Sequence, residues 1–189
     1  MPLNPMTFQN EFERKMLDWS LIGDKTDPVG INQNDNPPSD FDFALEFSTA
    51  YKTYAEEGMI IGVDIAAMSE PARSAMEGAL RGITGSNAPQ SRVLANAFAT
   101  FWANIVGPST HTLEHGGIAG AGISNTAMAM VGSIDAVIKS VITNSGNPNA
   151  WANLIEAVEG IVKTIVWTVV EVFTCGSSTC PISFPEMVS

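Results

Sequence analysis

The chain has few of the residues that most often carry chemistry. It contains 2 histidines, 2 cysteines and 9 Lys and Arg residues against 20 Asp and Glu, which gives a formal net charge of -11 over 189 residues. A balance this acidic repels a phosphate backbone, so we expect no nucleic-acid partner. Because only 15% of the residues are charged, the surface must include apolar atoms that a partner could cover. This profile favours a subunit of an assembly over a free monomer.

Long uninterrupted apolar runs are also missing. The two longest apolar stretches span residues 118–142 and 160–173, and polar or charged residues interrupt both: Asn125, Asp135, Lys139, Lys163 and Glu171. Neither provides the ~20 apolar residues that cross a bilayer, so we expect no membrane partner. The opening residues, MPLNPMTFQNEFERKM, have no basic segment followed by an apolar run. We therefore expect no signal peptide and a protein that stays in the cytoplasm where it is made.

The two cysteines lie close together, in the segment CGSSTC formed by Cys175 to Cys180. A disulfide across four intervening residues would close a small loop and remove little chain entropy. Two reduced thiols on a C-terminal tail are an equally good interpretation in a cytoplasmic protein. No histidine is close in sequence, so the pair does not predict a zinc site.

Both histidines occur in one stretch, GPSTHTLEHGG at residues 107–117. The order His111, Glu114, His115 matches the inverted zinc peptidases, where two imidazoles hold the metal and the glutamate activates water. Glycines and a proline bound the stretch and leave at most about two helical turns. A third ligand would have to come from elsewhere, with downstream candidates Glu156, Glu159 and Glu171. We favour a surface turn with solvated histidines, and keep a small zinc-dependent hydrolase as the alternative.

Other catalytic signatures are not found. The segment GGIAGAGIS has no preceding strand, there is no phosphate-binding loop with its lysine, and no Gly-x-Ser-x-Gly elbow occurs. The sequence therefore predicts no enzyme, no catalytic or metal-binding residues, no cofactor and no small-molecule substrate.

What the sequence does have is helical periodicity. In the first segment, residues 4–22, Phe8, Phe12, Met16 and Trp19 recur at steps of four, four and three and share one helical face. The 16 residues that follow, DKTDPVGINQNDNPPS, are dense in Asp, Asn and Pro and predict an extended linker. This detachable helix would dock on its own domain or on a neighbouring subunit.

Four or five further amphipathic helices are predicted. Their expected signals are a cap at Ser39 or Asp40, a cap at Ser69 with Pro71 in the first turn, an opening at Asn87, a helix over residues 124–143, and a last helix capped by Asn147. The strongest apolar face lies on the helix that ends before Gly107 and Pro108; its members are Val93, Leu94, Ala97, Phe98, Phe101, Trp102 and Ile105.

The end of the last helix is ambiguous. The continuation IVWTVVEVF is rich in β-branched residues, which permits a change to extended structure near Val166. The apolar spacing continues unbroken, so we expect helix through about Val170. The sequence thus predicts an all-α bundle of five to six helices with extended arms: an N-terminal helix and linker over 1–38, a helical core over 39–173, and a C-terminal arm over 174–189.

Three segments carry a resemblance: FALEFSTAYKTYAEEGM, LANAFATFWANIV and VVEVFTCGSSTCPISFP. In composition and order they resemble small structural proteins of tailed-phage virions, over about residues 41–185. The resemblance implies a scaffold role in tail, baseplate, neck or capsid surface, with other copies of the chain and other virion proteins as partners. It also implies location in the virion, and in the host cytoplasm during assembly. An adaptor module with a single partner is a further alternative.

Overall fold

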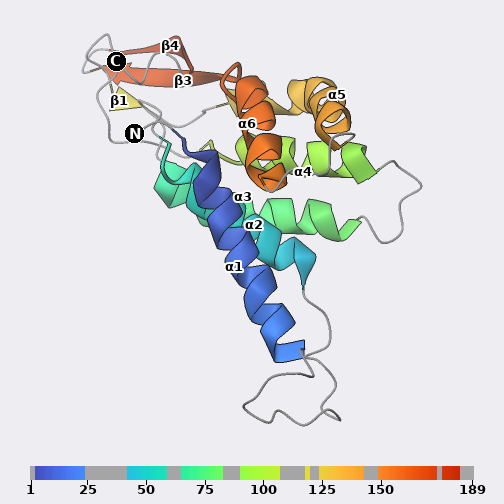
Figure 1. The fold of residues 1–189 in the computed structure, drawn as a ribbon. Helices are drawn as coiled ribbons and strands as arrows, with labels where there is room; N and C mark the ends of the chain where they lie inside the picture. The colour runs from blue at the N-terminus through green and yellow to red at the C-terminus, as the bar shows by residue number, and fades with distance from the viewer. Residues whose placement is uncertain are drawn as a thin grey trace.

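Six α-helices and a small antiparallel sheet form the described part of the chain (Figure 1). The computed structural model describes residues 3–23, 42–58, 65–82, 90–106, 118–119, 124–142, 149–173 and 176–183. The helices are α1 (Pro5–Gly23), α2 (Phe43–Ala55), α3 (Ile65–Arg81), α4 (Gln90–Ala103), α5 (Val131–Ile142) and α6 (Ala150–Val162). This confirms the predicted all-α bundle. None of the helices in the described ranges is both long and apolar enough to cross a membrane.

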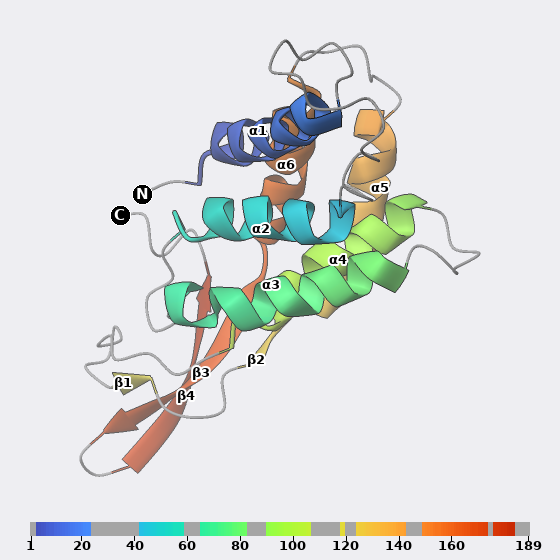
Figure 2. The same cartoon turned by 90° about the horizontal axis from the view of Figure 1, so that it is seen from below.

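The helices pack in a closed circuit. Each helix from α1 to α6 contacts the next one in the chain, and α6 returns to contact α1. Figure 2 shows α2 lying between α1 and α3. The large buried side chains inside this circuit are mostly aromatic: Phe8, Phe12, Phe47, Tyr51, Tyr54, Phe98, Phe101 and Trp102. The helix predicted to have the strongest apolar face, α4, supplies Phe98, Phe101 and Trp102 to this core.

Helix α1 is docked on its own chain. Asn4 precedes it and accepts from the Met6 N–H at 3.1 Å, and Pro5 occupies the first helical position, where a missing N–H costs nothing. Phe8 and Phe12 are fully buried against α2 and α6. The predicted helix at residues 4–22 is confirmed, as is its Phe8 and Phe12 face. The side chains of Met16 and Trp19 and the predicted linker lie outside the described residues.

Several predicted helix boundaries were wrong. The cap of α2 is Asp42, whose carboxylate accepts from the Leu45 N–H at 3.1 Å. Helix α3 begins at Ile65, so Ser69 and Pro71 lie inside it, and Ser69 instead donates to Glu56 at 2.6 Å. The N-cap of α6 is Asn149 rather than Asn147. Residues that can cap a helix occur at several neighbouring positions in the sequence, so the local pattern alone does not select the boundary.

The helix predicted for residues 124–143 is divided. Residues Ser124–Asn125 form strand β2, a 3-10 turn η2 covers Ala127–Met130, and α5 starts only at Val131. The Asn125 side chain accounts for the break, because it donates to the Trp102 carbonyl at 2.9 Å and accepts from the Ala127 N–H at 3.0 Å. A side chain that accepts from the N–H two residues further on marks a turn or the start of a helix, and the backbone of Asn125 pairs with Trp167 of β3 instead of continuing a helix.

The prediction of helix through Val170 is wrong. Helix α6 ends at Val162, and β3 (Val166–Phe173) pairs with β4 (Gly176–Ser183) in an antiparallel hairpin. Burial alternates along the first residues, with Trp167 buried between the exposed Val166 and Thr168. Val, Thr and Trp favour a strand where one face packs on a core. The predicted C-terminal arm at 174–189 therefore contributes β4.

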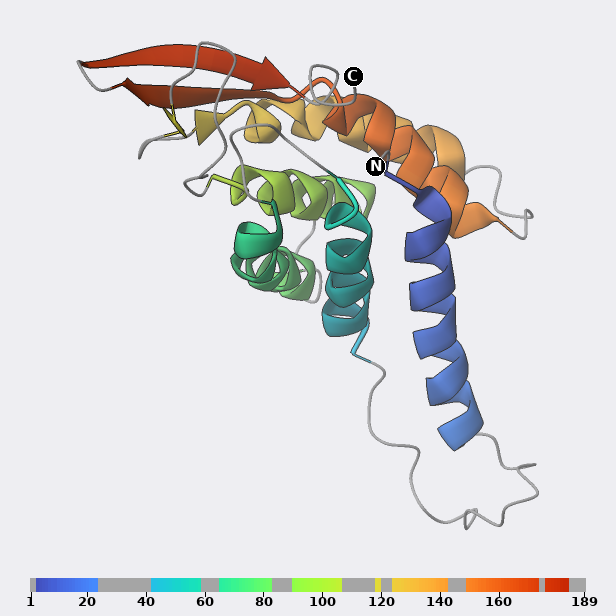
Figure 3. The same cartoon turned by 90° about the vertical axis from the view of Figure 1, so that its left-hand side faces the viewer.

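The sheet is antiparallel throughout its described strands. Strands β1 (Ile118–Ala119) and β2 pair with one edge of β3, while β4 pairs with the other edge. Figure 3 shows the hairpin extending from the bundle past the ends of α3 and α4. The Trp167 indole joins the sheet to the bundle, because it donates to the Ile105 carbonyl at 2.8 Å and its ring centroid lies 6.2 Å from that of Trp102.

Candidate assembly surfaces and polar clusters

The zinc alternative predicted for the histidine stretch is not tested by the described structure. His111, Glu114 and His115 lie outside the described residues. Of the candidate third ligands, Glu156 is exposed on α6, whereas Glu159 is buried on the same helix. Glu171 is placed in β3, opposite Ala119 and Ser178. Within the described ranges, no group of three or more His, Cys, Asp or Glu residues is arranged to hold a metal ion.

The two cysteines are placed only in part. Cys175 lies outside the described residues, and the backbone of Cys180 lies in β4 opposite Val169. The choice between a disulfide and two thiols stays open.

A buried polar cluster joins α2, α4 and α6. The Glu159 residue is 7% exposed, and its carboxylate accepts from the Tyr54 hydroxyl at 2.9 Å and pairs with the Lys163 ammonium. Next to it, the Tyr51 hydroxyl accepts from the Trp102 indole N–H at 2.8 Å. A carboxylate in a bundle core is tolerated only when it is hydrogen-bonded and paired, as it is here. The hydrogen bond between Tyr54 and Glu159 therefore links α2 to α6 across the core.

The pKa values of the two tyrosines in this cluster indicate what the hydroxyl groups can do. Burial is the main reason why the pKa of Tyr54 is raised, and the nearby Tyr51 and Glu159 raise it further. Burial also raises the pKa of Tyr51. Both phenols therefore remain protonated at physiological pH and act as neutral hydrogen-bonding groups rather than as bases.

The sequence prediction considered Glu159 only as a metal ligand. The position of Glu159 in its helix nevertheless indicates that it is a buried carboxylate with a partner on another helix. Glu159 follows Ile155 by four residues and precedes Val162 by three, so it lies on the apolar stripe of its helix. A carboxylate on such a stripe needs a partner from another helix. Tyr54, on the apolar side of the second predicted helix, offers a hydroxyl.

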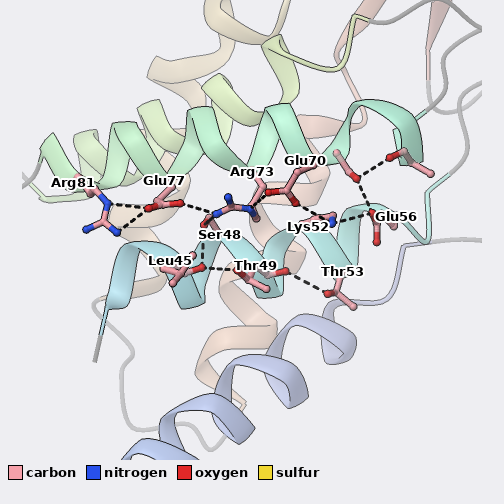
Figure 4. A network of polar contacts seen from close by, with 12 residues as sticks. Leu45, Ser48, Thr49, Lys52, Thr53, Glu56, Glu70, Arg73, Glu77 and Arg81 are labelled. Atoms are coloured by element: carbon pink, nitrogen blue, oxygen red, sulfur yellow. Dashed lines mark hydrogen bonds and ion pairs between the residues drawn. The ribbon is translucent and has the colours of Figure 1, made fainter. Parts of the chain in front are cut away.

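A second polar cluster covers the seam between α2 and α3 at the surface (Figure 4). Along α3, Arg81, Glu77, Arg73 and Glu70 alternate in charge; Arg73 binds Glu77 at 2.6 Å and Glu70 at 2.7 Å. From α2, Lys52 reaches Glu70 at 3.0 Å. We call these five residues the α2–α3 ladder. Arg81 also pairs with Asp42, the cap of α2, so the ladder ties the start of α2 to the end of α3.

The carboxylates of the ladder are held in their ionised form. The Arg73 guanidinium, followed by that of Arg81, lowers the pKa of Glu77. Arg73 and then Lys52 lower the pKa of Glu70. A general acid near neutral pH needs a raised carboxyl pKa, so these groups are unsuited to that role. The ladder is therefore best explained as a stabilising surface network.

Helix α1 is fixed by polar contacts as well as aromatic ones. The Gln9 side chain, which is buried, accepts from the Ala152 N–H in the first turn of α6 at 2.9 Å. At the start of α1, Thr7 donates to the Glu57 carboxylate at 2.7 Å, and the Asn4 N–H donates to it at 3.2 Å. Lys15 pairs with Glu46 of α2 at 3.2 Å. Gln9 of α1 thus caps the start of α6, and the sequence around α6 does not reveal this cap.

Comparisons with known proteins do not place the chain in a family. No protein-family profile, curated protein or solved structure matches it.

Proposed function

We propose that this protein is a structural subunit of a multi-protein assembly, as a component of a tailed-phage virion that acts through protein–protein contacts. The observation that carries the proposal is the β3–β4 hairpin, which extends from the helical bundle rather than packing along it (Figure 3). A projecting hairpin offers backbone donors and acceptors to a neighbouring chain.

The composition supports the same role. A net charge of -11 keeps the free subunit soluble, while the segment GSSTCPIS of β4 contains no charged residue. Neighbouring chains can therefore approach this strand without placing like charges opposite each other. The phage part of the proposal rests on the resemblance of residues 41–185 to small virion proteins.

The experiment compares the isolated protein with the native particle. Particles purified from the organism that encodes the chain should contain it in multiple copies, as measured by quantitative mass spectrometry. Limited proteolysis should cleave the hairpin region in the isolated protein and leave it intact in the particle. If the chain is missing from purified particles, or its hairpin is cleaved equally in both states, the proposal is wrong.

A further inference from the structure

Helix α1 packs antiparallel to α2 at the outside of the bundle (Figure 3). At the start of α1, the Thr7 hydroxyl donates to the carboxylate of Glu57, which follows the end of α2. Further along, Lys15 pairs with Glu46 in the first turn of α2. The end of α1 and the start of α2 therefore lie on the same side of the molecule.

The place where α1 docks is lined by four rings, which we call the α1 site: Phe43, Phe47 and Tyr51 of α2 and Trp151 of α6. The ring centroid of Phe12 lies 4.9 Å from that of Trp151. The other helices stay connected without α1, because contacts run from α2 through α3, α4 and α5 to α6. Helix α1 is thus an added layer that can leave its site without interrupting the order of the bundle.

The connection from α1 to α2 is much longer than the distance it has to cover. Helix α1 continues eight residues past Lys15, or ~12 Å, and α2 begins three residues before Glu46. With helix axes ~8–10 Å apart, the two ends lie ~12 Å from each other, which about four extended residues cover. The sequence places 18 residues, 24–41, between Gly23 and Asp42. A chain of that length can reach up to ~60 Å.

We infer that α1 is an exchangeable arm, which occupies the α1 site of its own chain in the free subunit and the α1 site of a neighbouring copy in the assembly. Because the copies are identical, each contact that α1 makes with α2 and α6 can form in either arrangement. The two arrangements then differ mainly in the effective concentration of the helix, which is of the order of millimolar for a tethered segment. The inference rests on the proposed function, because the assembly is what holds neighbouring copies at a comparable concentration.

Charge is compatible with an exchanged arm. A net charge of -11 on each molecule opposes close contact between two copies. Helix α1 carries only -1 of this charge, from three acidic and two basic residues: Glu11, Glu13, Asp18, Arg14 and Lys15. A connection that reaches ~60 Å lets two bundles stay further apart than the Debye length of ~8 Å. Exchange of α1 therefore joins copies without pressing their acidic surfaces together.

The pair formed by Lys15 and Glu46 allows the two arrangements to be counted. The Lys15 Nζ and Glu46 Oε2 atoms are 3.2 Å apart, so a carbodiimide can join them directly as an amide. Unlabelled and heavy-isotope-labelled full-length proteins are mixed in equal amounts in urea and refolded at final concentrations from ~1 μM to ~1 mM. Mass spectrometry then separates crosslinked peptides of one isotope, formed within a chain, from isotope-mixed peptides, which form only between chains.

Isotope-mixed peptides of Lys15 and Glu46 should rise from almost none at ~1 μM to at least ~10% at ~1 mM, near the effective concentration of the tethered helix. The matched control is the pair of Lys52 and Glu70, which are 3.0 Å apart and join α2 to α3. Its crosslinked peptides should stay unmixed at every concentration. Lys15→Arg, which keeps the charge but lacks the reactive amine, should lose the mixed peptide.

Two outcomes overturn the inference. Peptides of Lys15 and Glu46 that remain unmixed at ~1 mM would show that the α1 site accepts only the helix of its own chain. Equal mixing in the control pair of Lys52 and Glu70 would show that more of the chain than α1 is exchanged. Either result leaves the proposed function standing, whereas absence of the chain from purified particles removes that function whatever the isotope pattern.

Discussion

The helical bundle and the C-terminal hairpin are stabilised by different kinds of contact. In the bundle, aromatic rings from helices far apart in the chain interlock: the Phe47 ring centroid lies 5.0 Å from that of Phe8, 5.3 Å from Phe12 and 5.8 Å from Phe98. In the hairpin, β3 and β4 pair over their full lengths through the backbone, and the described anchor to the bundle is Trp167. The bundle is thus sensitive to side-chain volume, and the hairpin to backbone donors and its anchor.

The largest expected effect is in the bundle. Phe47→Ala removes a ring from the centre of the aromatic cluster and leaves a cavity among rings of three helices, so unfolding should become easier by about 3–5 kcal/mol. Urea denaturation followed by far-UV circular dichroism measures this change. Leu45→Ala on the same helix, at an exposed position, is the control and should change stability by less than about 1 kcal/mol. Equal effects of the two substitutions would contradict the assignment of the core.

A smaller effect is expected at the buried carboxylate. Tyr54→Phe removes the hydroxyl that donates to Glu159 and should destabilise the protein by about 1–3 kcal/mol, because the buried acceptor loses a donor. Adding Glu159→Met should cost less than the sum of the two single changes, since both partners are then apolar. A double-mutant cycle in urea tests this, and strict additivity would show that the contact contributes nothing.

The hairpin anchor can be weakened without removing its ring. Trp167→Phe keeps an aromatic side chain beside Trp102 but removes the N–H that donates to the Ile105 carbonyl. We expect a loss of about 1 kcal/mol, visible first as faster amide exchange in β3 and β4 while amides of α4 stay protected. Thr168→Ala, exposed on the opposite face, serves as control. Equal loosening of hairpin and bundle would show that they unfold as one unit.

The smallest expected effect is the part of the loss of folding stability at acid pH that is due to the α2–α3 ladder. The folded-state pKa values of Glu70 and Glu77 are lowered from 4.5, and that of Asp42 from 3.8, so the unfolded state binds more protons as the pH falls. The stabilisation they give is therefore present above about pH 5 and is lost as the pH falls through the folded values. Glu70 is exposed and Asp42 and Glu77 are only partly buried at the surface, so solvent screens these pairs and their contribution is modest.

Thermal unfolding at several pH values measures this dependence. Glu77→Gln should make the fall in melting temperature between about pH 5 and pH 3 shallower than in the wild type. Ser74→Ala, at an exposed position of α3 that carries no titratable group, should leave the slope unchanged. A steeper slope in Glu77→Gln would reverse the sign derived for this carboxylate.

Much of the bundle could be predicted from the sequence because its helices carry their own periodicity. The Phe8 and Phe12 face and the apolar side of α4 were both identified from spacing alone. Phe8 and Phe12 are buried, and so is the α4 face from Ala97 to Ile105, while Val93 and Leu94 are half-buried. The candidate site could not be predicted in the same way. The contact between Gln9 and Ala152 joins positions 143 residues apart, and the partner of Glu159 lies 105 residues away, so no local pattern specifies either contact.

In residues 124–143 and 166–173, tertiary structure decided where the chain forms a strand instead of a helix. Their apolar spacing is compatible with helix, yet Asn125 binds the end of α4 and Trp167 packs against Trp102. Residues 124–125 and 166–173 therefore form strands, and helix α5 starts only at Val131. The sequence by itself determined which faces are apolar, since that requires only the identity and period of the side chains. The fold decided where helices stop and which buried polar groups meet, because a hydrogen bond across the core exists only after distant segments have come together.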